Sequence, residues 1–336
     1  MEPGAGRFDL SPDDLTGLLA GEPAYRARQV WRSLHQGREP EEMTDLPAPL
    51  RARLAPLLAP SLELARESVS DRGGTVKWLW RLGDGSAVET VLMRYPDRAT
   101  VCVSSQAGCA MACSFCATGQ AGFTRHLSTG EIVEQVVRAR RASPTRVGNV
   151  VFMGMGEPMA NYEAVWAAVE RLHGDLGLSA RHITISTVGV VPGIHRLATE
   201  ALPVNLAVSL HAANDALRDE LVPLNRRYPL ARLMAACRAY QGAKGRRLSF
   251  EWALIDGVND RPTDSRELAA LALPLAAHVN LIPLNPTPGY AARGTPAAGV
   301  AAFRDRLRAA GVNATVRRNR GTSIDAACGQ LAARPG

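Results

Sequence analysis

Three cysteines stand close together in the sequence, at Cys109, Cys113 and Cys116, in the spacing C-x3-C-x2-C. Three thiolates at this spacing can hold one metal centre. A structural zinc site needs four ligands, usually in two pairs, and the sequence holds no second C-x2-C pair, although His126 could supply the fourth ligand. An iron–sulfur cluster suits the triplet better, because three cysteines on a cluster of four irons leave one iron open to a substrate.

Small and polar residues follow the predicted strands downstream of the triplet. The first of these strand ends reads Gly154-Met155-Gly156-Glu157-Pro158, where the glycines are also what a tight turn requires. The later strand ends carry Ser186, then Ser209, Leu210 and His211, and finally Asn285. Ser and Asn are common at strand ends for turn chemistry alone, so each position is a weak signal when taken singly.

The triplet, with the aromatic Phe115 before its last cysteine, resembles the radical S-adenosylmethionine (SAM) superfamily. The resemblance implies a [4Fe-4S] cluster on the three cysteines, whose open iron chelates the amino and carboxylate groups of SAM before its cleavage to a 5′-deoxyadenosyl radical. Segment 154–158 resembles that superfamily's GGEP motif, which implies that Gly156 and Glu157 receive the methionine amino group. The remaining cofactor contacts that it implies are Ser186, Ser209, Leu210, His211 and Asn285.

Three further cysteines lie outside the triplet. Cys237 falls in an apolar run that is typical of a helix, where a cysteine usually acts as a small buried side chain. Cys102 precedes the triplet by seven residues, and Cys328 lies near the C-terminus between Gly321 and Gly329. Glycines on both sides of Cys328, after the last predicted strand, indicate a mobile loop rather than a position in the core.

Separated blocks along the chain narrow the resemblance: ATVCVSSQAGC, CATGQAGF, VFMGMGEP, HVNLIPLNP and DAACGQL. Together they resemble the RlmN family of bacterial RNA adenine-C2 methyltransferases, over the stretch from about Thr75 to Leu331. The resemblance implies a cytoplasmic enzyme that methylates C2 of the adenosine at position 2503 of 23S ribosomal RNA and at position 37 of tRNA.

The same resemblance implies a role for Cys328, Cys102 and Glu89. Adenine C2 is electron-poor and cannot attack the methyl group of SAM, so the methyl group travels through the Cys328 sulfur and two SAM molecules are used per turnover. Glu89 then accepts the C2 proton, a role that a glutamate on an alternating strand would not suggest without the family. Attack of Cys102 on the Cys328 sulfur releases the base and leaves a disulfide, which an external electron donor such as flavodoxin reduces.

Two other functions fit part of this pattern. Methylation of adenine C8 in the same ribosomal nucleotide, an antibiotic-resistance activity, uses the same cysteine pair and cluster. A zinc-stabilised RNA-binding protein without enzymatic activity would explain the triplet and the basic charge. Overall similarity favours the C2 enzyme.

An alternation of strands and helices must position these residues. The predicted strands are residues 76–82, 87–94, 99–105, 149–153, 182–187, 204–210, 248–254, 278–284 and 313–317. The predicted helices between them are residues 128–141, 162–173, 229–241, 261–276 and 297–310. Strands that alternate with helices of this length predict an α/β fold with a parallel sheet, here a partial (βα)6 barrel with its chemistry at the carboxyl ends of the strands. Residues 1–75 are predicted to form a helical accessory domain with a possible RNA contact, and residues 76–336 the core with a β-strand extension and the Cys328 loop.

Charge and hydropathy set the remaining limits. The formal net charge is +7, which favours a polyanionic partner, and the basic segment 317–320 is the preferred phosphate contact. The most apolar stretch, residues 269–284, is broken by two prolines, a histidine and an asparagine, so no membrane span is expected. The N-terminus lacks a basic, apolar leader, which predicts a cytoplasmic chain whose cysteines serve as metal, catalytic or buried thiols.

Overall fold

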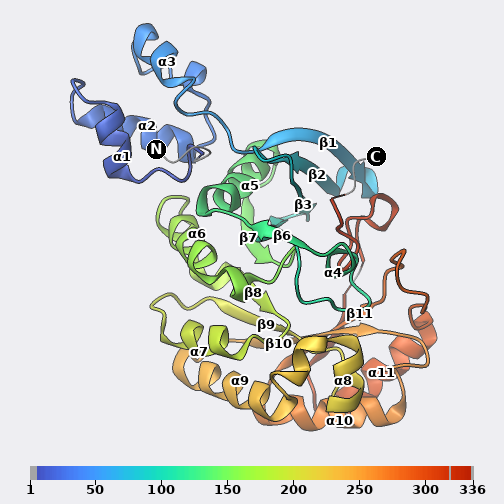
Figure 1. The fold of residues 1–336 in the computed structure, drawn as a ribbon. Coiled ribbons are helices and arrows are strands. Elements are labelled where there is room, and N and C mark those ends of the chain that lie inside the picture. Colours follow the sequence, from blue (N-terminus) through green and yellow to red (C-terminus); the bar gives the residue numbers. More distant parts are fainter. Residues whose placement is uncertain (1–5, 318, 334–336) are drawn as a thin grey trace.

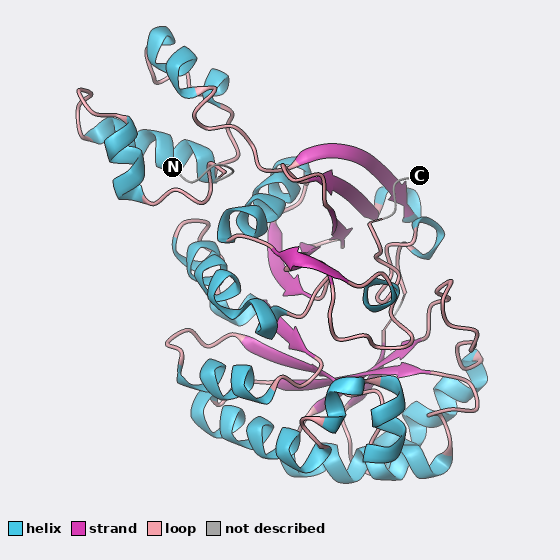
Figure 2. Ribbon diagram, in the orientation of Figure 1, coloured by secondary structure: helices cyan, strands magenta, loops and turns pink. Residues whose placement is uncertain are grey.

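A ten-stranded sheet organises the computed structural model, which describes residues 6–317 and 319–333. The strand order is β1-β2-β3-β4-β7-β8-β9-β10-β11-β12, and β4 is the strand at which the pairing changes from antiparallel to parallel. The sheet curves, with most helices on its outer face and the C-terminal segment inside (Figures 1 and 2).

The parallel part is the predicted partial barrel. Its strands are β4 (Ala99–Cys102), β7 (Val147–Phe152), β8 (Ile183–Thr187), β9 (Asn205–Ser209), β10 (Leu248–Leu254), β11 (His278–Pro283) and β12 (Ala314–Val316). Its helices are α5 (Thr129–Ala142), α6 (Tyr162–Gly174), α7 (Val191–Thr199), α8 (Asp215–Leu221), α9 (Leu230–Lys244), α10 (Pro262–Ala272) and α11 (Ala297–Ala309). Six strand–helix units and a closing strand are present, which confirms the predicted α/β architecture.

Local sequence explains why these helices begin where they do and pack where they do. Ser128 caps α5, since its side chain accepts from the Glu131 amide while the Glu131 carboxylate accepts from the Ser128 amide. On β10, Trp252 is fully buried and stacks against Phe303 of α11 at 6.1 Å between ring centroids. Apolar faces of this kind hold the helices on the outside, so the inner rim of the sheet is left for polar residues.

An antiparallel extension precedes the barrel. It consists of β1 (Glu63–Ser70), β2 (Thr75–Arg81) and β3 (Ala87–Arg94), with β3 paired to β4. The prediction that residues 1–75 are helical is wrong for β1, which pairs along its length with β2. Most of β1 is exposed, because it is an edge strand without a buried face, so its sequence carries no apolar alternation.

The N-terminal helices are α1 (Pro12–Leu18), α2 (Tyr25–His35) and α3 (Ala48–Leu54), which lie to one side of the barrel (Figure 1). They are tied to α5: the Asp9 carboxylate accepts from the Gly130 amide at 2.7 Å, and buried Glu134 accepts from the Ser61 amide at 2.8 Å. None of the helices in the described ranges is long and apolar enough to cross a membrane.

A small hairpin and one short helix hold the cysteine triplet inside the barrel. The hairpin is β5 (Gln106–Gly108) with β6 (Phe123–His126), and α4 (Ala117–Gln120) lies between its strands. Neither the hairpin nor α7 and α8 was predicted from the sequence. Strands of three and four residues are too short to show a period.

Candidate active site

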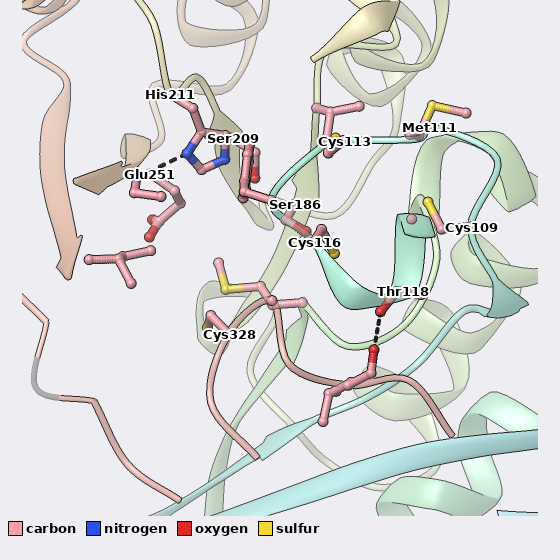
Figure 3. Close-up of a pocket in the computed structure, with 18 of the residues that line it drawn as sticks. Cys109, Met111, Cys113, Cys116, Thr118, Ser186, Ser209, His211, Glu251 and Cys328 are labelled. Atoms are coloured by element: carbon pink, nitrogen blue, oxygen red, sulfur yellow. Dashed lines mark hydrogen bonds between the residues drawn. The ribbon is translucent and has the colours of Figure 1, made fainter. Parts of the chain in front are cut away.

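One cavity at the carboxyl ends of the parallel strands gathers most of the predicted site residues (Figure 3). The predicted residues that line it are Cys109, Cys113, Cys116, Gly156, Glu157, Ser186, Ser209, His211, Asn285 and Cys328. The other three lie elsewhere: Leu210 is fully buried behind the rim, while Cys102 and Glu89 line two neighbouring cavities. Residues from five strand ends and from the C-terminal loop therefore share one wall.

The triplet occupies the loop between β5 and α4. The loop is fixed by its backbone, in which the Cys109 amide donates to the Gly122 carbonyl at 2.7 Å and the Cys116 amide donates to the Cys113 carbonyl at 3.2 Å. All three thiols are free. Burial raises the pKa of Cys109 to about 12 and that of Cys113 well above its usual value. A positively charged metal centre would reverse this by stabilising the thiolates.

The donor set suits an iron–sulfur cluster better than a single ion. In the part of the chain that the structure describes, no three His, Cys, Asp or Glu side chains come together as ligands of one metal ion. His126, the alternative fourth zinc ligand, is exposed and pairs with the Gln106 amide nitrogen at 3.0 Å. Thiolates that each hold a different iron of a cluster do not need to converge on one point.

The glycine-rich end of β7 lies directly against the start of the triplet hairpin. A Cβ on Gly154 would lie 2.6 Å from the Val103 carbonyl oxygen, and one on Gly156 would lie 2.6 Å from the Gln106 Cβ. Gly156 also has a φ of +98°, which side chains rarely adopt. Glycine is therefore required here by close backbone packing, which brings the following glutamate beside the cysteines.

Glu157 bridges two strand ends with its carboxylate. One oxygen accepts from the Met159 amide at 3.0 Å and the other accepts from the Val188 amide, just beyond β8, at 2.8 Å. The side chain is almost completely buried and has no cation within ion-pair distance among the described residues. Burial raises the pKa of Glu157 to about 7, although the hydrogen bonds from the two backbone amides lower it in part.

This raised pKa should make the metal-free protein less stable as the pH rises. Between pH 4.5 and about 7 the folded state keeps a proton on Glu157 that the unfolded state has lost, so unfolding becomes easier with increasing pH. We expect Glu157 to lower the free energy of unfolding by on the order of 3 kcal/mol across this window, relative to Glu157→Gln. Chemical denaturation of both proteins at several pH values measures the difference, and parallel curves would contradict it.

The rim residues are held by specific contacts. The Ser186 hydroxyl donates to the Phe152 carbonyl at 2.6 Å, and Nδ1 of His211 accepts from the Ala253 amide at 3.0 Å. Burial lowers the pKa of His211 to about 3, so the ring is neutral at physiological pH. Asn285 donates to the Cys328 carbonyl at 3.1 Å, which connects the rim to the C-terminal loop.

Arg218 supports this rim and was missed in the sequence. Its fully buried guanidinium donates to the carbonyl of Leu210 at 3.0 Å and to that of Val188 at 2.6 Å. It also donates to the Asn225 side chain at 2.8 Å. Arg218 thus joins the ends of β8 and β9 from behind the cavity. An arginine seven residues beyond His211 in a helical, arginine-rich chain gives no signal of such a role.

Cys102 and Cys328 share a second cavity with Arg317. Cys102 ends β4, is buried, and is paired in register with Val91 on one side and Val151 on the other. Cys328 lines both this cavity and the first one. Burial raises the pKa of Cys102 to about 12, the neighbouring Cys328 raises it further, and Arg317 opposes both effects. Half-buried Cys328 is thus the cysteine, among the described residues, that lines both cavities.

The basic segment 317–320 lies differently from what the sequence suggested. Arg317 lines both cavities instead of standing free on the surface, and Cys328 is the main cause of its raised pKa. Arg320 donates to the Arg94 carbonyl at 2.6 Å and lies over the Tyr95 ring. Position 318 falls outside the described residues. Arg317 therefore lies beside Cys328, and Arg320 ties this segment to the end of β3. Cys237 is fully buried in α9, as predicted.

Comparison with known proteins agrees with this geometry. Residues 103–269 match the family described as the radical SAM superfamily. A probable dual-specificity RNA methyltransferase RlmN from Salinispora tropica is 55% identical, covering 98% of this chain and 92% of that protein. One from Chloroflexus aurantiacus is 53% identical, with 97% and 92% covered. A crystal structure of a radical SAM methyltransferase from Sphaerobacter thermophilus superposes with a TM-score of 0.93 at 52% identity, covering 98% and 99% of the two chains.

Proposed function

The chain belongs to the RlmN family of radical SAM RNA methyltransferases, which use a [4Fe-4S] cluster and SAM, and we propose that it methylates C2 of adenosine in 23S ribosomal RNA and in tRNA. The expected target positions are 2503 in the ribosomal RNA and 37 in tRNA. A zinc-stabilised protein without activity is set aside, since the family is one of enzymes. Methylation of these two RNAs fits a cytoplasmic protein, which would receive its electrons from a small carrier such as flavodoxin.

The position of Cys328 supports the proposal most strongly. Cys328 lines the cavity that holds the triplet and the proposed SAM-contact residues, and it also lines the cavity of Cys102. A sulfur atom that carries a methyl group between a cofactor and a base must meet both. The loop's contacts with Asn285 and with the Ala117 amide, which donates to the Gly329 carbonyl at 2.8 Å, hold it at this junction.

The residues around the cavities divide the work. Cys109, Cys113 and Cys116 would hold the cluster, which together with SAM would supply the methyl group and the radical that activates it. Cys328 accepts the methyl group as a thiolate and carries it to the base. Glu89 accepts the proton from C2. The Cys102 thiolate then attacks the Cys328 sulfur, the sulfur–carbon electron pair leaves with the carbon bonded to the base, and a proton taken up by that carbon completes the methyl group.

Glycine and carboxylate at the end of β7 suit the methionine part of SAM. Glu157 has both oxygens on backbone amides, and an added ammonium group would supply the missing cation at this buried carboxylate. Ser186, Ser209 and Asn285 offer hydrogen bonds to the nucleoside along the same wall.

Nucleoside mass spectrometry tests the reaction. RNA from a strain that lacks the modification is treated anaerobically with reconstituted enzyme, SAM and reductant, and is digested beside standards of both methyladenosine isomers. We expect 2-methyladenosine in both RNAs. A yield of 8-methyladenosine would contradict the proposed position, and unmodified RNA would contradict the proposed substrate.

A further inference from the structure

Glu89, the proposed proton acceptor, is held by a buried lysine that no motif singles out. Lys77 on β2 places its Nζ 2.7 Å from Oε1 of Glu89 on β3, and both residues are almost fully buried. In the antiparallel register Glu89 lies opposite Leu79, so Lys77 is its diagonal neighbour on the same face. The ion pair is therefore built into the sheet and does not depend on a flexible loop.

Both partners of this ion pair also hold the loop that carries Cys328. Lys77 donates to the Asp325 carbonyl at 3.2 Å. The second oxygen of Glu89 accepts from the Ala332 amide at 2.9 Å and from the Ala333 amide at 3.2 Å. The loop is thus fixed on each side of Cys328 by one member of the pair.

Charge around Glu89 comes from few groups. The charged side chains that line its cavity are Arg66, Lys77 and Asp325. Lys77 makes an ion pair with Glu89. The segment over its other oxygen, residues 329–333, has no ionisable side chain. A buried carboxylate that loses its cation takes up a proton, and a protonated Glu89 could not accept another.

Composition adds an independent hint. The chain contains two lysines against 37 arginines. The other lysine, Lys244, lies at the end of α9, far along the sequence from this site, and donates to the Glu200 carbonyl. An ammonium group is a compact point charge, whereas a guanidinium needs a wider planar space. A lysine in this buried position of an arginine-rich chain fits a place where one short cation must meet one carboxylate.

We propose that Lys77 is a positioning residue for methyl transfer. It keeps Glu89 ionised and directed at the base, and its hydrogen bond to the Asp325 carbonyl holds the Cys328 loop beside Glu89. This inference rests on the proposed function, since it needs Glu89 to be the proton acceptor. Proton transfer is balanced within the site: the C2 proton moves to the Glu89 carboxylate, and Lys77 stays protonated and bonded to the Asp325 carbonyl.

Rate against pH for Lys77→Met, Lys77→Arg and the matched control Lys244→Met tests the inference. We expect Lys77→Met to lose at least about tenfold of its RNA methylation rate at pH 7, and the loss to shrink as the pH rises, because a buried carboxylate without a cation holds its proton to higher pH. Lys77→Arg should regain part of the rate at pH 7, and Lys244→Met should follow the unaltered enzyme throughout. A pH profile is read within each variant, so incomplete folding lowers the whole curve without moving it.

Two outcomes separate this inference from the function on which it rests. If Glu89→Gln abolishes methylation while Lys77→Met keeps the pH profile of the unaltered enzyme, the role of Lys77 is wrong and that of Glu89 stands. If Glu89→Gln turns over at full rate, the assignment of the proton acceptor fails first. Methylation of Cys328 by SAM comes before the proton step, so it should persist in Lys77→Met. Peptide mass spectrometry measures it.

Discussion

Replacing Cys328 by alanine should abolish RNA methylation. In the time that the unaltered enzyme completes many turnovers, the variant should form no methyladenosine above background. Among the described residues, Cys328 is the cysteine that lines both the cavity of the triplet and the cavity of Cys102. Without its sulfur the methyl group has no acceptor that can reach the base. Tritium transfer from the methyl group of SAM to RNA measures the loss.

Cys237→Ala is the matched control for this change. Cys237 is fully buried in α9 and lies outside both cavities, so we expect its replacement to leave methylation near the original rate. Iron content should be the same in both variants, because neither residue belongs to the triplet. Methylated RNA from Cys328→Ala would show that another nucleophile accepts the methyl group.

Replacing Cys102 by alanine should stop the reaction one stage later, with enzyme and RNA joined covalently. Cys102 shares its cavity with Cys328 and with Arg317, whose charge favours the thiolate needed for attack on the neighbouring sulfur. Without that attack the bond between the Cys328 sulfur and the base carbon persists. Denaturing gel electrophoresis should show a band of added RNA mass, at no more than one equivalent per enzyme.

Nuclease treatment and the double variant provide the controls. The added mass should collapse to a nucleotide-sized remnant after nuclease digestion, and it should be missing from Cys102→Ala combined with Cys328→Ala. Free methylated RNA in multiple turnovers from Cys102→Ala would rule out a resolving role for Cys102.

The parallel strands could be predicted because their sequences are apolar and evenly spaced. Residues 248–254 form β10 as expected, since apolar residues alternate with Ser249 and Glu251 at the start of this mostly buried strand. β1 could not be predicted in this way, because most of its side chains are exposed and its stability comes from pairing with β2. The β5–β6 hairpin is held by tertiary packing and is too short to leave a pattern.

Several predicted site residues lie together, while their roles stay predictions. The triplet was predicted from its thiols and their spacing, Glu157 and Cys328 were predicted from the family resemblance, and all of them line one cavity. Lys77 and Arg218 escaped because a buried cation on a strand or helix looks in sequence like a solvated one. The place of Arg317 beside two thiols was not expected for the same reason, and its contact with phosphate stays a prediction.

The place of Cys102 on the sheet has a consequence for the whole catalytic cycle. Cys102 is anchored between two hydrogen-bonded strands, whereas Cys328 sits in a loop that contains left-handed turns at Gly321 and Gly329. A disulfide between them would tie the Cys328 loop covalently to the sheet at the end of every catalytic cycle. Reduction of this disulfide would then control the start of the next cycle. Without electrons the enzyme would stay oxidised, with Cys328 bonded to Cys102 and the RNA already released.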